Sequence, residues 1–192
     1  MRLKIAENSD INGILKLHNK YQVDSIKEDD KKDGFVTTAF SKEQLQDIIE
    51  QEQGIFIAIK DDEVLGYVMS ASWQYWSKWA MFTFMIDDLT NLKYLDTTLT
   101  INNSYQYGPA CIDKKVRGSG LLEKLFDFAL ESMSKKYPIL VTFVNKINLR
   151  SFEAHKRKLG LEIIQEFEFN GNQYHELVYD TSKRVLKWYN KF

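Results

Sequence analysis

The sequence predicts a mixed α/β (α+β) fold, in one domain that spans residues 1–192. The 192 residues are 44% apolar and 14% aromatic, which is enough material for one sizeable hydrophobic core. Short runs with strand-like alternation, or with apolar residues throughout, interchange with segments of helical periodicity. No repeat, low-complexity tract or linker separates them. These observations favour a single layered unit built from both strands and helices.

The first 70 residues are expected to hold a strand, two helices and a hairpin. Ser9 is expected to cap the first helix, and Ser41 with Gln44 has the spacing of a capping box for the second. Asp61 and Asp62 form a turn-prone pair between two apolar runs, which predicts an antiparallel hairpin. In order, the expected elements are a strand at 3–6, a helix with Ile11, Ile14, Leu15 and His18 on its apolar face, a helix from Ser41 to Gly54 that buries Leu45, Ile48 and Ile49, and strands at 55–59 and 64–70.

The middle of the chain gives a weaker signal than its two ends. Residues 72–104 begin with a dense group of aromatic side chains and continue as a polar stretch, and no secondary structure is assigned to them. The remaining elements are a strand at 105–112, a helix at 121–133 with Leu122, Leu125, Phe126, Ala129 and Met133 on one face, a strand at 139–144, a helix at 148–159 ended by Gly160, a hairpin at 163–169 and 174–179, and a C-terminal helical face with Val185, Trp188, Tyr189 and Phe192.

Charge and cysteine content narrow the functional classes. The chain has 26 basic and 27 acidic side chains, so no basic excess draws it to nucleic acid or to an anionic membrane. Cys111 is the only cysteine, which excludes an internal disulfide and suits a reducing compartment. The N-terminus lacks the apolar core of a signal peptide, and the most apolar stretch, 79–86, is too short to span a bilayer. A cytoplasmic protein without nucleic-acid or membrane partners is therefore expected.

The stretch 111–122 predicts an anion-binding turn. A strand ends at Ile112, a short turn follows, and Gly118 and Gly120 open the next helix. Glycines allow backbone angles and a close approach that other residues forbid. Successive N–H groups in such a turn form an anion-binding nest at the positive end of the helix, which suits a diphosphate. Arg117 adds positive charge, although its backbone can matter more than its side chain.

Two other phosphate-binding motifs do not fit this stretch. The nucleotide P-loop requires Gly-Lys-Ser/Thr after the loop, whereas Leu121-Leu122 follow here. The dinucleotide fingerprint requires a third glycine and a parallel βαβ unit near the N-terminus, and the sequence has neither.

The turn resembles the acetyl-CoA-binding motif of the GCN5-related N-acetyltransferases (the GNAT superfamily), written Gln/Arg-x-x-Gly-x-Gly/Ala. The match runs from Arg117 to Gly120 and departs at Leu122, where the family usually has Gly or Ala. The order of expected elements also resembles that fold over essentially the whole chain. The resemblance implies a mostly antiparallel central sheet flanked by helices, acetyl-CoA as co-substrate and no metal. It places the coenzyme against Cys111, Ile112, Asp113, Arg117, Gly118, Ser119, Gly120, Leu121, Leu122, Asn148 and Ser151.

A second segment supports the resemblance. Residues 148–155 are similar to the family's Asn-x-x-Ala/Ser-x-x-x-Tyr/His pattern, which closes in Gly-Phe where this chain has Gly160-Leu161. The spacing from His155 to Gly160 is one residue longer than usual, which predicts an irregular end to this helix. By resemblance, Asn148 bonds the pantetheine arm and His155 stands near the thioester sulfur.

The resemblance also implies a reaction, which is direct attack of a primary amine on the thioester through a tetrahedral intermediate. Backbone N–H groups near Cys111 and Ile112 would stabilise the oxyanion, and His155 would donate a proton to the leaving thiolate. A hydrogen-bonded packing role for His155 is equally open. Histone-type members of that family carry a Glu on the strand before the motif, and the nearest equivalent here is Ser104, so no base is assigned. The alternatives are a water chain, an amine that is already neutral, or Asp87, Asp88, Tyr105 and Tyr107.

The leading functional hypothesis is an N-acetyltransferase for a small-molecule primary amine, with a homodimer left open. The alternative is a non-catalytic acyl-CoA-binding module that uses the aromatic segment 73–84 as a partner surface. A third hypothesis is a protein- or aminoacyl-directed transferase. The aromatic side chains are expected in the core or at a dimer surface, or else as a wall of the acceptor pocket. Structural roles are expected for His18 and Cys111, and a surface or acceptor-side position for His175.

Overall fold

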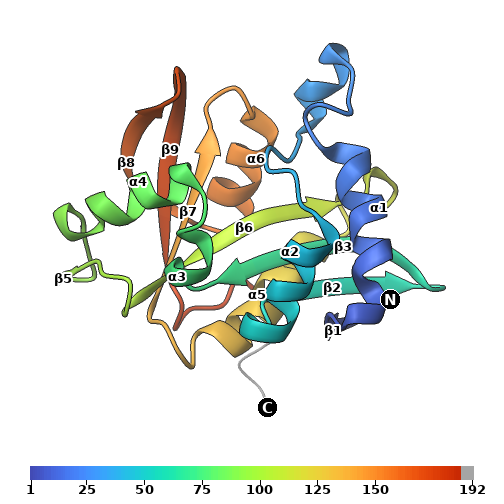
Figure 1. The fold of residues 1–192 in the computed structure, drawn as a ribbon, viewed down its shortest axis with the longest axis horizontal. Helices are drawn as coiled ribbons and strands as arrows, with labels where there is room; N and C mark the ends of the chain where they lie inside the picture. Colours follow the sequence, from blue (N-terminus) through green and yellow to red (C-terminus); the bar gives the residue numbers. More distant parts are fainter. Residues whose placement is uncertain (187–192) are drawn as a thin grey trace.

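The protein is built on one seven-stranded sheet, and a computed structural model describes residues 1–186, except for the side chains of Asp30 and Lys32. The strand order is β1-β2-β3-β6-β7-β9-β8, and every neighbouring pair is antiparallel except β6 and β7 (Figure 1). The elements are β1 (Arg2–Ile5), α1 (Ile11–Tyr21), α2 (Lys42–Asp47), β2 (Ile55–Lys60), β3 (Glu63–Ala71), α3 (Trp73–Trp76), α4 (Ala80–Asp88), β4 (Lys93–Tyr94), β5 (Thr97–Thr98), β6 (Ser104–Ile112), α5 (Leu121–Met133), β7 (Ile139–Asn145), α6 (Leu149–Glu153), β8 (Glu162–Phe169) and β9 (Asn172–Asp180).

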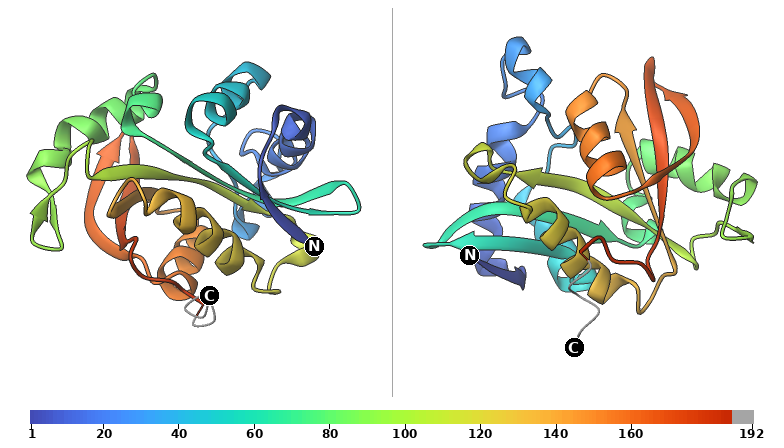
Figure 2. Two further views of the ribbon diagram at one scale, coloured as in Figure 1. Left: turned by 90° about the horizontal axis from the view of Figure 1, so that it is seen from below. Right: turned by 180° about the vertical axis from the view of Figure 1, so that it is seen from behind.

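Helices cover both faces of the sheet. Figure 2 shows α1 to α4 on one face, and α5 and α6 on the other. Each face has its own hydrophobic cluster, because side chains alternate between the two faces along every strand. Ile57 and Val141 belong to the cluster under α1 to α4, whereas Phe56 and Leu140 belong to the cluster under α5. The predicted mixed fold, with a mostly antiparallel sheet between helices, is confirmed.

A fork between the two parallel strands shapes the middle of the sheet. β6 and β7 pair only at their beginnings, where the last matched residues are Gln106 and Val141. β6 continues to Ile112 and β7 to Asn145 without further pairing to each other among the described residues. The diverging strands therefore leave the inner edge of each strand without a neighbour, and this edge borders the site described below.

Most of the predicted local signals act as expected. Ser41 and Gln44 form both bonds of the capping box: the Gln44 N–H donates to Ser41 Oγ at 3.2 Å, and the Ser41 N–H donates to Gln44 Oε1 at 2.8 Å. Asp61 and Asp62 both take the left-handed conformation that a tight hairpin turn needs. The predicted irregularity before Gly160 is confirmed as a π-helical turn, Ala154–Lys158, which accommodates the extra residue.

Three sequence predictions need correction. Ser9 does not cap α1, because it lies inside a short 3-10 turn, Asn8–Asp10, that precedes the helix. The Asp10 carboxylate caps this turn by accepting from the Glu7 N–H at 2.8 Å. Gly54 does not end the second helix, since Gln53 makes the left-handed turn, with φ 50°. A Cβ at Gly54 would lie 1.9 Å from the Ser70 carbonyl oxygen, so close backbone approach requires this glycine.

The third correction concerns the C-terminal helical face. Val185 lies in a bend and packs, partly buried, against the cluster under α5, so it does not belong to a helix. Trp188, Tyr189 and Phe192 lie outside the described residues. The unassigned stretch 72–104 contains α3, α4 and the small β4–β5 pair.

Candidate active site

The glycine turn leaves the start of α5 open. Gly118 and Gly120 have φ of 82° and 78°, and a Cβ at either position would meet nothing within 4 Å. No side chain caps α5, and the first N–H of the helix bonded within it, among the described residues, is that of Lys124, which donates to the Gly120 carbonyl at 3.1 Å. The preceding N–H groups at the helix start are therefore available to an anion.

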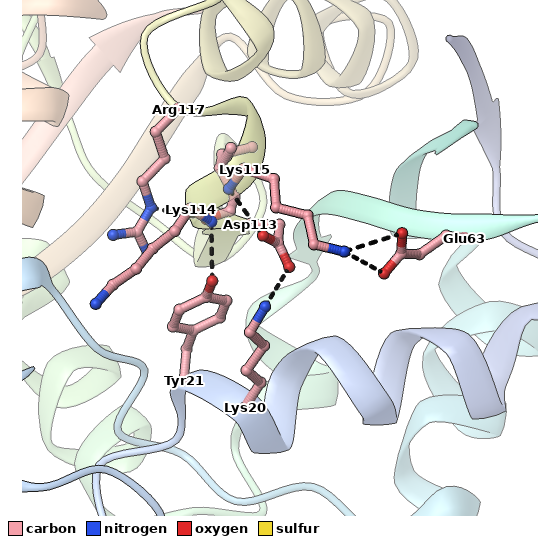
Figure 3. A network of polar contacts seen from close by, with 8 residues as sticks. Lys20, Tyr21, Glu63, Asp113, Lys114, Lys115 and Arg117 are labelled. Carbon is pink, nitrogen blue, oxygen red and sulfur yellow. Dashed lines mark hydrogen bonds and ion pairs between the residues drawn. The ribbon is translucent and has the colours of Figure 1, made fainter. Parts of the chain in front are cut away.

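The side chain of Arg117 is engaged with the protein itself. Its Nε donates to the Ile112 carbonyl at 2.9 Å, and its Nη1 donates to the Asp33 carbonyl at 2.8 Å. The guanidinium carbon stands 4.9 Å from the centre of the Tyr21 ring, a cation–π arrangement (Figure 3). Arg117 therefore ties the turn to the loop after α1.

A second set of contacts fixes the turn to α1. Asp113 accepts from Lys20 Nζ at 2.8 Å and from the Lys115 N–H at 2.9 Å, and the Lys114 N–H donates to Tyr21 Oη at 2.8 Å (Figure 3). Burial raises the pKa of the Asp113 carboxyl, but these bonds outweigh it and hold the pKa below its ordinary value. Asp113 is therefore a charged anchor under the turn.

Two adjoining cavities meet at the site. The turn cavity has cationic side chains near the glycine turn, namely those of Arg117, Arg150 and Lys158. The fork cavity lies between the diverging strands β6 and β7 and reaches α4. Both cavities are lined by Phe35, Val36, Ala110, Ser151 and His155.

A segment without any sequence motif lines both cavities. This crossing segment, residues 33–38, runs between α1 and α2 and contributes lining residues to both cavities. Four side chains hold its carbonyl groups. Arg117 binds that of Asp33, and Asn148 Nδ2 donates to that of Phe35 at 2.9 Å. Gln22 Nε2 donates to that of Thr37 at 3.5 Å, and His18 Nε2 contacts that of Thr38 at 2.8 Å. No local motif marks the segment, and only the partners brought by the fold reveal it.

His155 sits in the π-helical turn, at the junction of the two cavities. Its Nδ1 lies 2.7 Å from the Ser151 carbonyl, and because a carbonyl only accepts, this nitrogen carries a proton. Burial lowers the pKa of His155 below its ordinary value, while the bond to Ser151 opposes that shift. The ring is therefore neutral at pH 7, with a lone pair on Nε2. The Tyr107 ring packs edge-on against it at 5.7 Å.

The two backbone groups considered for an oxyanion differ in direction. The Asp113 N–H donates to the Leu65 carbonyl of β3 at 2.9 Å. Since successive N–H groups of a strand point to opposite sides, the N–H of Ile112 points toward the fork and that of Cys111 toward β3. The bond from Arg117 to the Ile112 carbonyl agrees with this alternation, because that carbonyl also points away from β3.

The structure gathers most of the predicted site residues around the two cavities. Asp113 and Ser119 do not line either cavity, and the Ser119 hydroxyl donates to the Val116 carbonyl at 2.7 Å. Asn148 lines only the fork cavity, and its Oδ1 accepts from the Ser151 N–H at 3.2 Å. The turn cavity is lined by Cys111, Ile112, Arg117, Gly118, Gly120, Leu121, Leu122, Ser151 and His155.

The remaining histidines and the aromatic segment have mainly packing contacts. His18 is fully buried between Tyr67 Oη, at 2.6 Å, and the Thr38 carbonyl, in agreement with a structural role. His175 stacks on the Phe152 ring at 4.4 Å. In the segment 73–84, Phe84 is exposed and Trp79 is partly buried, whereas Trp73, Tyr75, Trp76 and Phe82 are buried in the core.

Among the described side chains, no group of three or more His, Cys, Asp or Glu residues is arranged to hold a metal ion. No helix in this described part of the chain has the length and apolar character needed to cross a membrane.

Comparison with solved structures identifies the fold. No protein-family model matches the chain, and no curated protein sequence matches it. The protein smu.2055 from Streptococcus mutans UA159 is 17% identical with a TM-score of 0.64, over 94% of this chain and 99% of that one. The ribosomal-protein-alanine N-acetyltransferase from Brucella melitensis is 14% identical with a TM-score of 0.60, over 94% and 99%. The protein yncA from Salmonella typhimurium, solved with its cofactor acetyl-CoA, is 12% identical with a TM-score of 0.62, over 96% and 95%. The chain has the fold of the GCN5-related N-acetyltransferases.

Proposed function

We propose that the protein is an N-acetyltransferase that transfers the acetyl group of acetyl-CoA to the primary amine of a small molecule. The observation that carries the proposal is the meeting of two cavities at His155, one beside an open glycine turn and the other between two diverging strands. This arrangement gives two substrates separate routes to a common point. The solved structure of yncA with acetyl-CoA, on the same fold, supports the identity of the first substrate.

The residues of the turn cavity fit the coenzyme. The glycines at 118 and 120 let a diphosphate approach the free N–H groups at the start of α5, and Arg150 and Lys158 add positive charge. The edge of β6 along the fork offers backbone groups to the amide-rich pantetheine arm. Bound there, the coenzyme supplies an activated acetyl thioester.

In the proposed reaction, the acceptor nitrogen enters through the fork cavity and attacks the thioester carbonyl with its lone pair. The C–N bond forms, the carbonyl oxygen becomes negative, and the Ile112 N–H is oriented to stabilise that charge. When the carbonyl re-forms, the C–S bond breaks and the thiolate leaves. The nitrogen gives up one proton and the thiolate takes one up, so the reaction consumes no net proton.

His155 is suited to carry this proton between the two atoms. Because Nδ1 already donates to the Ser151 carbonyl, a neutral His155 first accepts at Nε2 and then donates from the same nitrogen to the thiolate. In this proposal His155 acts first as a base, when it accepts the proton of the amine. It then acts as the predicted general acid, when it donates that proton to the thiolate.

A binding and turnover experiment tests the proposal. Calorimetry with acetyl-CoA is expected to show binding at one site per chain, and a thiol-reactive dye should detect CoA release that depends on an added amine. The Arg150→Ala, Lys158→Ala double variant should bind acetyl-CoA more weakly, whereas Lys93→Ala, Lys183→Ala serves as a charge-matched control outside the two cavities. Absence of acetyl-CoA binding would contradict the proposal, and binding without amine-dependent release would favour a non-catalytic module.

A further inference from the structure

We propose that the fork cavity selects a weakly basic amine that carries a flat apolar group, and that Gln106 accepts a hydrogen bond from the nitrogen of this acceptor. The inference rests on the proposed acetyltransferase function and adds a substrate class to it. It is carried by the position of Gln106, by the lack of charge around it and by the aromatic side chains opposite.

Gln106 lies where the fork begins. It is the last residue of β6 that pairs with β7, and its side chain lines the fork cavity while only 2% of the residue is exposed. Its Nε2 donates to the Tyr107 carbonyl at 2.6 Å, which fixes the amide orientation, because a carbonyl only accepts. Gln106 Oε1 is then left buried without a hydrogen-bond partner among the described protein groups. A buried acceptor of this kind requires a donor, and an acceptor amine entering the cavity provides one.

The described residues that line the fork cavity carry no formal charge. The described side chains that line the fork cavity include no carboxylate and no Lys or Arg, and its one histidine, His155, is neutral. Glu176 is close in the sheet, since its strand partner Phe143 lines the cavity, but Glu176 itself does not line it. Its Oε2 accepts from Gln165 Nε2 at 2.8 Å, and Asp88 of α4 accepts from the same nitrogen. Burial raises the pKa of the Glu176 carboxyl to about 7, which weakens it further as a counter-ion.

An uncharged cavity disfavours a strongly basic amine. An alkyl amine with the pKa of a lysine side chain is neutral in only about one molecule in 2,500 at pH 7, whereas an amine with the pKa of an α-amino group is neutral in about one in ten. The charged form of the alkyl amine would lose its hydration in the cavity without gaining a counter-ion. A weakly basic amine avoids both costs, because it enters already able to attack.

Aromatic side chains define the rest of the cavity. Phe82, Phe143 and Tyr174 line it, and Phe143 meets the other two rings edge-on at 5.7 and 5.5 Å between centroids. Rings arranged in this way present flat apolar faces as well as edges, which suits an aromatic or planar apolar group. The polar end of such a molecule would lie toward Gln106 and His155, and its apolar end toward α4.

Phenylhydrazine and benzylamine provide a matched pair of probes. Both join a phenyl ring to a terminal amino group through one atom, but the terminal nitrogen of phenylhydrazine is far less basic. In the complex with CoA at neutral pH, calorimetry should show phenylhydrazine binding at least tenfold more tightly than benzylamine. Gln106→Leu should weaken phenylhydrazine three- to tenfold, the effect of one lost hydrogen bond, and Gln106→Glu should reduce the preference at least tenfold by offering benzylammonium a counter-ion.

The same titrations separate this inference from the proposed function. CoA binding is measured first for each variant and is expected to stay within threefold of wild type, because Gln106 does not line the turn cavity. Equal or tighter binding of benzylamine, no binding of either probe, or an unchanged preference in Gln106→Glu would each overturn the inference while leaving CoA binding intact. Loss of CoA binding in the wild type would instead remove the proposed function.

Discussion

Comparing Gly120→Ala with Gly171→Ala distinguishes the effect of backbone strain from the effect on ligand binding. Gly120 and Gly171 both have positive φ, 78° and 72°, and a Cβ at either position meets nothing within 4 Å. Placing an L-residue in this conformation costs about 1–2 kcal/mol. Gly120→Ala and Gly171→Ala should therefore lower the free energy of unfolding by a similar amount. They differ in place, since Gly120 lines the turn cavity and Gly171 lies in the turn between β8 and β9.

Only the substitution in the turn should affect the coenzyme. The methyl group of Gly120→Ala lies beside the free N–H groups at the start of α5, where it would hold a diphosphate away from them. Loss of one charge-assisted hydrogen bond costs about 1.5–3 kcal/mol, which corresponds to a rise in the acetyl-CoA Kd of about 10- to 150-fold. The Kd of Gly171→Ala should match that of the wild type.

Calorimetry with acetyl-CoA and urea unfolding of the same samples give both quantities. The expected result is two equally destabilised variants, of which one binds normally. If both variants lose affinity in parallel with their stability, the effect is general strain and not a ligand site. If Gly120→Ala binds as well as the wild type, the diphosphate does not contact this turn and the assignment of the turn cavity fails.

Three further predictions concern titrating side chains. His155→Gln should lower kcat about 100-fold and leave the acetyl-CoA Kd unchanged. Because burial lowers the pKa of His155, wild-type kcat/KM should fall only at a pH below the ordinary histidine pKa, where the ring becomes protonated. Both kcat and kcat/KM are measured by CoA release. Asp113→Asn should lower the free energy of unfolding by about 1 kcal/mol near pH 7, because Lys20 is half exposed, and urea titrations should show the difference shrinking as pH falls through the depressed pKa of Asp113. As pH rises from 5 to 8, the free energy of unfolding of Glu176→Gln should increase relative to that of the wild type, by at most about 3 kcal/mol. The reason is that burial raises the pKa of Glu176 in the folded protein to about 7, so the unfolded chain ionises at a lower pH. A difference in the free energy of unfolding that does not change with pH would contradict that pKa.

The parts of the fold that were predictable are those specified by neighbouring residues. The Ser41–Gln44 capping box, the Asp61-Asp62 turn and the glycines of the turn before α5 each act through backbone groups within four positions. The longer spacing from His155 to Gly160 belongs with them. A π-helical turn uses one more residue per hydrogen bond, and the Leu159 N–H indeed donates to the Ala154 carbonyl at 3.2 Å.

The parts that were missed depend on contacts between distant residues. Nothing near residues 33–38 indicates that they cross the site, because the side chains that hold this segment come from positions 18, 22, 117 and 148. Gln106 was overlooked for the same reason: in the sequence it is one polar residue in an apolar strand. Its importance arises from the end of the β6–β7 pairing, which no local pattern encodes.

The polar groups at the turn are therefore of two kinds, side chains that bond to the protein and backbone N–H groups open to a ligand. Arg117, Asp113 and Asn148 use their side chains on other protein groups, which are the Asp33 carbonyl, Lys20 and the Phe35 carbonyl. The groups left for a ligand are mainly main-chain N–H groups, at Ile112 and at the start of α5. Substitutions of Arg117 or Asn148 should then act on both cavities, because each side chain holds the crossing segment. A substitution of Asp113 should act on the turn cavity, because this side chain anchors the turn. Substitutions at Gly120 or Gln106 should act on one cavity alone.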